Sequence, residues 1–305
     1  IADSSRLLKF SLKGRLLWAQ KYEHEILCLS CSSGFLIILF KNGDCFLISV
    51  HTGYIMCSRK YPGMRRVVGY PYGLLGIDED NRLHCIIMKR CSWDFTWHPQ
   101  MHDVGIDSTS IEIPKEYHEA GPFRIVTKNE HYLAVAGMYG MAINTGHSRQ
   151  KDNKWTIVHP KSLDSQVFFD HVAFLDDSFL VAAVTRASAS DNRVNHELRI
   201  YTVSATPINI ACRIPLSQRV KCLCIDQYFK VITVIDQSNM MRAFKCTHSG
   251  WTDLCTADLQ TEEPVRRVLN YRDHYHVLVG HHIYRLSQAA LVGQNYTMAR
   301  IVELG

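Results

Sequence analysis

The chain has 305 residues, of which 47% are hydrophobic and 21% are charged, so it can bury a large core and is not intrinsically disordered. No run of about 18 apolar residues occurs, and the sequence therefore predicts no membrane-spanning helix. The net charge of +5 is spread along the chain without a Lys/Arg block, which argues against a nucleic-acid-binding protein. The chain begins at Ile1 with no signal-peptide pattern, and we expect a fragment of a longer multidomain protein.

The first elements are two short apolar runs, residues 6–12 and 15–20, separated by Gly14. A fuller unit follows at residues 25–61. It consists of four apolar, β-branched or aromatic runs: EILCLSCSS, GFLIILFKNG, DCFLISVHTG and YIMCSRKY. The breaks contain Asn-Gly and Thr-Gly, where Gly43 and Gly53 supply the positive φ that tight hairpin turns need. Four antiparallel strands of this length predict one blade of a β-propeller.

Five further units of the same kind follow in chain order. They lie at residues 65–98, 123–160, 170–215, 219–259 and 266–303, with a polar linker expected from Pro99 to about Pro114. Recurrence at about 40–50 residues is typical of blades arranged around an axis. We therefore predict an all-β fold, a single β-propeller of six or seven four-stranded blades over residues 1–305. The N-terminal runs are expected to close it by joining the C-terminal blade, because an unpaired strand edge favours aggregation.

Two polar segments without a β pattern interrupt these units, at residues 145–153 and 186–195. Loops on a rigid scaffold often carry binding residues. Both segments are basic. Arg149, Lys151, Arg186 and Arg193 are therefore candidate contacts with a partner or an anionic membrane. The alternative is a pair of solvated hairpin loops.

Motifs for chemistry are absent from the sequence. The 11 cysteines fall mostly within β runs and fit reduced core thiols of a cytosolic protein. Cys28 and Cys31 have the spacing of a metal knuckle but lack a second pair, and His274 and His276 share a strand face without a further ligand. We predict no catalytic residues, no metal and no cofactor, and hence no enzyme.

The segment from residue 111 to about 246 resembles a known family. It combines an I-P-x-x-Y…G-P-x-R entry, an A-V-A-G-x-x-G-x-A strand pair, a Lys-Trp strand and an E-L-R-x-Y strand. The matching residues are Ile113, Pro114, Tyr117, Gly121, Pro122, Arg124, Ala134, Val135, Ala136, Gly137, Gly140, Ala142, Lys154, Trp155, Glu197, Leu198, Arg199 and Tyr201. The pattern is similar to the propeller region of the large subunit of a Golgi guanine-nucleotide exchange complex, which activates a Rab-family GTPase in retrograde endosome-to-Golgi traffic.

The resemblance implies a non-catalytic scaffold on the cytoplasmic side of the Golgi membrane, with exchange activity only in the full complex. Its implied partners are the second subunit of the complex, the Rab GTPase and the membrane surface, but no nucleic acid. Within the segment we expect Trp155 to be largely buried, and Glu197 and Arg199 to form a solvated pair on one strand face.

Two other hypotheses about the function stay open. One is a generic WD-repeat-like interaction module of a coat, a ubiquitin-ligase receptor or a nuclear-pore scaffold. The other is a quinoprotein-type propeller enzyme, against which stand the missing tryptophan-docking spacing and the missing secretory signal.

Overall fold

The structure, a computed structural model, describes the chain except for residues 1, 4, 12–14, 33–34, 71–72, 81, 94–95, 104–122, 130, 138–139, 145–154, 159–164, 189–192, 206, 248–249, 272–273, 288–298 and 304–305. The described residues form strands and turns with no helix, as predicted, and so include no helix able to cross a membrane. They fall into two compact units, residues 1–157 and 158–305, and each is described by itself.

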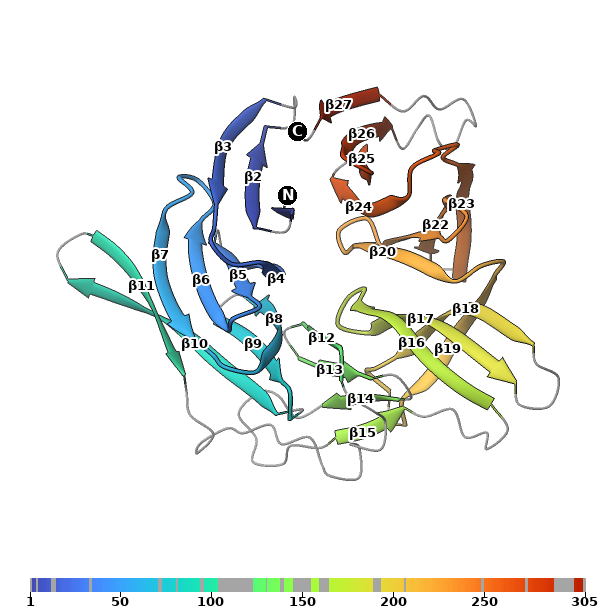
Figure 1. Ribbon diagram of the computed structural model, residues 1–305. Coiled ribbons are helices and arrows are strands. Elements are labelled where there is room, and N and C mark those ends of the chain that lie inside the picture. Colours follow the sequence, from blue (N-terminus) through green and yellow to red (C-terminus); the bar gives the residue numbers. More distant parts are fainter. Residues whose placement is uncertain are drawn as a thin grey trace. The chain divides into compact units, whose positions relative to one another are not determined.

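The first unit begins with a three-stranded sheet and continues with three four-stranded antiparallel sheets, which are seen in Figure 1 from blue to green. The three-stranded sheet contains β1 (Ala2–Asp3), β2 (Arg6–Phe10) and β3 (Leu16–Lys21). The next contains β4 (Ile26–Ser32), β5 (Phe35–Phe40), β6 (Asp44–Ser49) and β7 (Ile55–Lys60). The third contains β8 (Met64–Tyr70), β9 (Gly73–Asp78), β10 (Leu83–Trp93) and β11 (Thr96–Asp103). The last contains β12 (Ile125–Lys128), β13 (Leu133–Ala136), β14 (Met141–Asn144) and β15 (Trp155–Val158).

The second unit has three four-stranded antiparallel sheets within its described residues. The first contains β16 (Ser165–Phe174), β17 (Phe179–Ser188), β18 (Val194–Thr202) and β19 (Asn209–Leu216). The second contains β20 (Val220–Asp226), β21 (Val231–Asp236), β22 (Met240–Thr247) and β23 (Gly250–Asp258). The third contains β24 (Val265–Tyr271), β25 (His274–Val279), β26 (His282–Ser287) and β27 (Ala299–Glu303). In all six four-stranded sheets the strands pair in sequence order.

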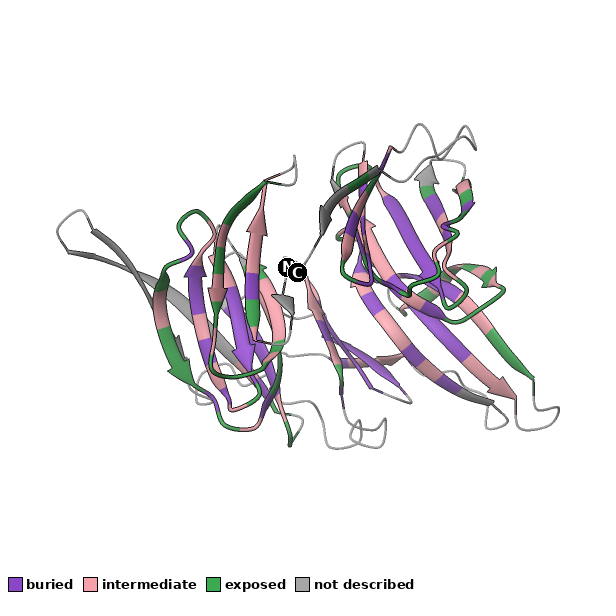
Figure 2. Cartoon of the chain, turned by 45° about the horizontal axis from the view of Figure 1, so that its top comes forward, coloured by how far each residue is buried: buried purple, intermediate pink, exposed green. Residues whose placement is uncertain are grey.

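The core lies between neighbouring sheets, and the middle strands are therefore apolar on both faces. In β21, Ile232 and Val234 pack with side chains of β17 and β18, whereas Ile235 packs with side chains of β24 and β25. All six residues of β21 are buried, while β19, at a sheet edge, alternates between exposed and half-buried residues. Figure 2 shows the same gradient, with buried residues concentrated on the middle strands. The continuous apolar runs in the sequence thus mark the strands that have a sheet on each side.

The hairpin turns use the residues expected from their backbone geometry. Gly43 and Gly53 have φ of 85° and 78°, which confirms their predicted role. In three consecutive sheets the turn between the first two strands is closed by an Asx side chain. Asn129, Asp176 and Asp226 each accept a backbone N–H, from Tyr132, Phe179 and Phe229 respectively, at 2.7–2.9 Å.

The N-terminal runs and the C-terminal sheet lie in different compact units, and the expectation that they join stays a prediction. β2 and β3 pair with each other, β1 adds to β2, and the outer position of the C-terminal sheet is already filled by β27. Trp18 and Tyr22 pack on a core cluster that includes Phe40 of the next sheet. This contact holds the β2–β3 hairpin against that sheet.

Two expected loops are also shorter than predicted. Half of the segment 186–195 is strand, since β17 extends to Ser188 and β18 starts at Val194. Pro99, expected in a linker, pairs with Arg90 in the edge strand β11, where proline is tolerated because one side of the strand needs no N–H donor. The polar segment 145–153 lies outside the described residues.

Candidate functional site

The four predicted contact residues fall into two groups. Arg149 and Lys151 lie outside the described residues. Arg186 and Arg193 stand near the ends of β17 and β18, on either side of the connection between them. Arg186 pairs with Asn195, and the Arg193 carbonyl accepts the Ser188 N–H at 3.0 Å. Because side chains alternate along paired strands, Arg186 and Arg193 lie diagonally on one face of the hairpin. The fold therefore brings these two predicted residues together.

The other face of this hairpin carries a polar network around Asp170. Asp170 is the extra residue of a β-bulge in β16, and the bulge turns its carboxylate towards β17. Thr185 Oγ1 donates to Asp170 Oδ2 at 2.6 Å and lies 3.1 Å from His196 Nδ1. Arg219, just before β20, donates its Nε–H to Asp170 Oδ1 at 2.9 Å. The network thus connects two neighbouring sheets.

Burial disfavours the charged form of His196, and the hydrogen bond to Asp170 fixes Arg219. Burial lowers the pKa of His196, with the Arg219 charge adding to this and the Asp170 charge opposing it. Since the Thr185 hydroxyl donates to Asp170, the hydrogen atom in the Thr185–His196 contact comes from His196 Nδ1. The Asp170 side chain is only 6% exposed, whereas that of Arg219 is 51% exposed. This end of the sheet therefore carries Arg219, which Asp170 holds in place, in addition to Arg186 and Arg193.

Glu197 and Arg199 form an ion pair, but the expectation that it is solvated is wrong. Arg199 Nε donates to Glu197 Oε1 at 2.6 Å, and the Arg199 side chain is only 4% exposed. Burial alone would lower the pKa of Arg199, but Tyr201 and Glu197 outweigh it and raise the pKa. The i, i+2 spacing shows that two side chains share a face, but it does not show whether that face is covered. Trp155, by contrast, is 9% exposed, and its predicted burial is confirmed.

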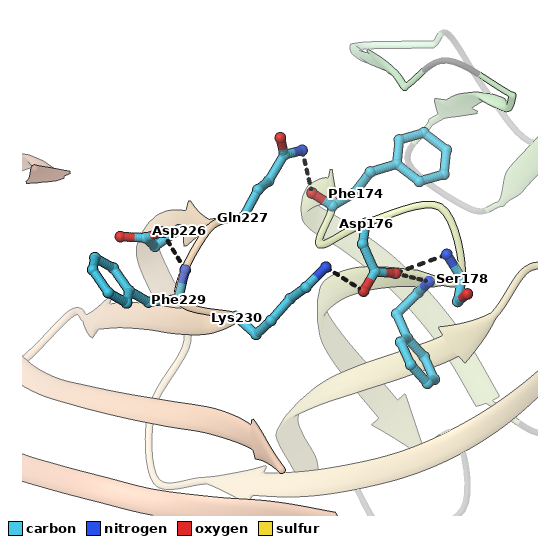
Figure 3. Close-up of polar contacts among 8 residues, drawn as sticks. Phe174, Asp176, Ser178, Asp226, Gln227, Phe229 and Lys230 are labelled. Carbon is cyan, nitrogen blue, oxygen red and sulfur yellow. Dashed lines mark hydrogen bonds and ion pairs between the residues drawn. The ribbon is translucent and has the colours of Figure 1, made fainter. Parts of the chain in front are cut away.

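The opposite end of these two sheets holds a second inter-sheet ion pair, shown in Figure 3. Asp176 Oδ1 accepts the N–H groups of Ser178 and Phe179 at 2.7 and 2.9 Å, and its Oδ2 binds Lys230 Nζ at 2.6 Å. Burial opposes ionisation, but the hydrogen bonds from Lys230 and the two backbone groups outweigh it and lower the pKa of Asp176. Gln227 Nε2 also donates to the Phe174 carbonyl at 3.3 Å.

The turn joined by these contacts exposes two aromatic rings. Tyr228 is 85% and Phe229 43% exposed, and their ring centroids are 4.8 Å apart in an edge-to-face arrangement. We did not predict this pair from the sequence. Its signal was there: Tyr-Phe stands between Asp226 and Lys230, in a turn where small polar residues are usual.

The cysteine and histidine residues considered as metal ligands lie in or beside strands of the sheets. Cys28 donates its thiol to the Val67 carbonyl, and Cys222 to the Arg266 carbonyl, each at 3.3 Å between the first strands of neighbouring sheets. Cys31 is exposed on β4. Burial, followed by the charge of His274, lowers the pKa of His276. Within the described ranges no three His, Cys, Asp or Glu side chains are grouped to hold a metal ion.

No family model and no curated protein sequence matches the chain. Solved structures do match it. The WD40 repeats of RRP9 share 11% identity at a TM-score of 0.56, over 92% of this chain and 82% of that one. The structure of U3-55K shares 10% at 0.56, over 92% and 84%. The C-terminal WD40 domain of Sif2 shares 10% at 0.56, over 91% and 74%. The fold is therefore a WD40-type β-propeller with six four-stranded blades in the described residues, as predicted.

Proposed function

We propose that this propeller is a protein-interaction scaffold that performs no chemistry itself. The observation that carries the proposal is the basic end of the β17–β18 hairpin, where Arg186 and Arg193 share one face and the Asp170 network fixes Arg219. Guanidinium groups gathered at the end of a sheet suit contact with carboxylates of a partner. WD40-type folds in solved structures are consistent with such a role, since propellers are most often binding scaffolds.

The assembly that we propose is a Golgi guanine-nucleotide exchange complex for a Rab-family GTPase, acting in retrograde transport. Support for it comes from the resemblance of residues 111–246 to the large subunit of that complex. In this proposal the propeller binds the second subunit at the cytoplasmic face of the Golgi membrane, and nucleotide release requires the whole complex. A generic WD-repeat-like module of a coat, a ubiquitin-ligase receptor or a nuclear pore is the second candidate, and the fold supports it equally.

Reconstitution tests both levels of the proposal. The chain is combined with the second subunit and the GTPase, and release of fluorescent GDP is followed. We expect release above the spontaneous rate from the complex and not from the isolated propeller. Acceleration by the propeller alone would contradict the scaffold role, and no complex with these partners would favour the generic module.

Charge reversal tests the basic end. Arg186→Glu combined with Arg193→Glu should weaken assembly or recruitment without lowering the melting temperature. The control is Arg59→Glu with Lys60→Glu, which reverses two exposed charges on the edge strand β7. Equal effects of both pairs would mean that the basic end has no specific role.

A further inference from the structure

The Tyr228–Phe229 turn is the most exposed aromatic feature of the described residues, and its backbone is held on both sides. Asp226 Oδ1 accepts the Phe229 N–H at 2.9 Å, so the turn is closed internally. Gln227 and Lys230 fasten it to the neighbouring sheet through Phe174 and Asp176. The contacts flank the two rings and leave their outer surfaces open.

Lys230 shows that the turn geometry is specifically maintained. Its φ of 56° lies in the left-handed region, which disfavours a residue with a Cβ. Such conformations persist where surrounding contacts hold them, and they are concentrated at functional sites. Here Lys230 forms the ion pair with Asp176, and Asp226 binds the Phe229 N–H beside it. The two rings are therefore presented on a backbone that loses little freedom on binding.

Charge around the rings selects the kind of partner. Asp176 and Asp226 take part in the contacts of the turn, and the exposed Asp177 follows Asp176 in the chain; with the one ammonium group of Lys230 the balance is −2 in a chain of net charge +5. An anionic membrane or a nucleic-acid backbone would be repelled by this balance. A cation is favoured twice, because aromatic faces attract guanidinium and ammonium groups and the carboxylates pair with them.

We propose that this turn, which we call the aromatic turn (residues 226–230), binds a segment of a partner protein in which Arg or Lys stands beside an apolar side chain. The cation lies against the ring of Tyr228 with the carboxylates around it, and the apolar neighbour packs on Phe229. Exposed Tyr residues on fixed backbones are frequent anchors of protein interfaces. This proposal rests on the proposed scaffold role only in its general form. The aromatic turn lies at the other end of the sheets from Arg186 and Arg193, and its surroundings are acidic where theirs are basic.

Short peptides test this with the whole chain. The probe is a labelled Gly-Leu-Arg-Leu-Arg-Gly peptide, compared with versions carrying Glu or Gln in place of Arg, and binding is followed by fluorescence anisotropy. Vesicles of phosphatidylcholine with phosphatidylserine are tested in parallel. We expect the Arg peptide to bind and the Glu peptide and the vesicles not to bind through this turn. No binding of the Arg peptide up to about 1 mM, equivalent to −4 kcal/mol, would overturn the proposal.

Variants show whether binding occurs at the aromatic turn. Tyr228→Ala should weaken binding of the Arg peptide at least about tenfold, whereas Tyr228→Phe should retain it. Tyr54→Ala is the matched control, because Tyr54 is 73% exposed in a turn, residues 50–54, that has no carboxylate. Asp177→Lys should weaken binding several-fold and reduce its salt dependence. Equal binding by Tyr228→Ala and the wild-type chain would refute the assignment.

The same assay separates this proposal from the function proposed above. The Arg186→Glu/Arg193→Glu chain should bind the Arg peptide normally, since those residues lie at the other end of the sheet. If the peptide binds but no exchange complex forms in the reconstitution, only the proposal of a Golgi exchange complex is refuted. A working complex without Tyr228-dependent peptide binding would refute only the aromatic turn.

Discussion

The two ends of the β16–β19 and β20–β23 sheets each contain an inter-sheet ion pair, but the surfaces beside these ion pairs differ. At each end an Asp of the first sheet binds a cation that belongs to the second, Asp170 with Arg219 and Asp176 with Lys230. The Asp170 side chain is 6% exposed and belongs to a network with Thr185 and His196, whereas that of Asp176 is 25% exposed and closes a turn. One pair orders a basic surface and the other supports two exposed rings. An inter-sheet ion pair thus holds two sheets together, and the residues next to it determine the charge and polarity of the surface.

The loss of a side chain from a hydrophobic core cluster provides a reference for the stability effects at both ends. Trp155→Ala should lower the free energy of unfolding by about 3–5 kcal/mol, because the ring fills space in a core cluster with Phe123 and Leu133. Urea unfolding of the purified chain measures this. A change below 1 kcal/mol would mean that the ring contributes little to the core.

Asp170→Asn should lower the free energy of unfolding by about 2 kcal/mol, since an amide cannot accept from both Thr185 and Arg219 as the carboxylate does. Thermal or urea unfolding detects the loss. The matched variant Thr185→Val removes one donor from the same network and should cost less. Equal stability of Asp170→Asn and the wild-type chain would show that the network is not structural.

Asp176→Asn should lower the free energy of unfolding by only about 1 kcal/mol or less, because both members of its ion pair are partly exposed and screened by solvent. The same unfolding experiment applies. If this variant costs more than Asp170→Asn, burial does not distinguish the two ends, and the comparison fails.

Acidification should affect the Asp170 end at a pH where the Asp176 end is unchanged. The pKa of His196 is below its ordinary value of about 6.5 because burial disfavours the charged form, so the unfolded chain takes up the proton first. Stability is then complete above pH 6.5 and falls as the pH decreases towards the folded-state pKa. His196→Gln should flatten this part of the pH profile of unfolding. An unchanged slope would assign the effect to other groups, His276 first.

Tyr228→Ala should change the free energy of unfolding by no more than about 0.5 kcal/mol, because its ring is 85% exposed and loses few contacts. Differential scanning calorimetry compares it with Tyr54→Ala. A marked destabilisation would show that the ring belongs to the fold and is not offered to a partner.

Much of the fold follows from local patterns. The four-run units, the glycines at positions 43 and 53 and the burial of Trp155 were all predicted, because strand alternation and turn chemistry act over a few residues. The basic pair Arg186 and Arg193 was also selected by composition alone. The length of the loop between Arg186 and Arg193 was not predicted correctly. β17 and β18 pair with each other further into the polar segment than the composition indicates.

The remaining features depend on neighbours that the sequence does not specify. The burial of Arg199 and the exposure of Tyr228 depend on which surfaces other strands cover, and neither follows from the strand or turn pattern in which the residue stands. The sequence alone determined that this protein is built from repeated antiparallel sheets with apolar middle strands. Only the tertiary structure paired Asp170 with Arg219 and Asp176 with Lys230, 49 and 54 residues apart, because such contacts arise when separate sheets pack together.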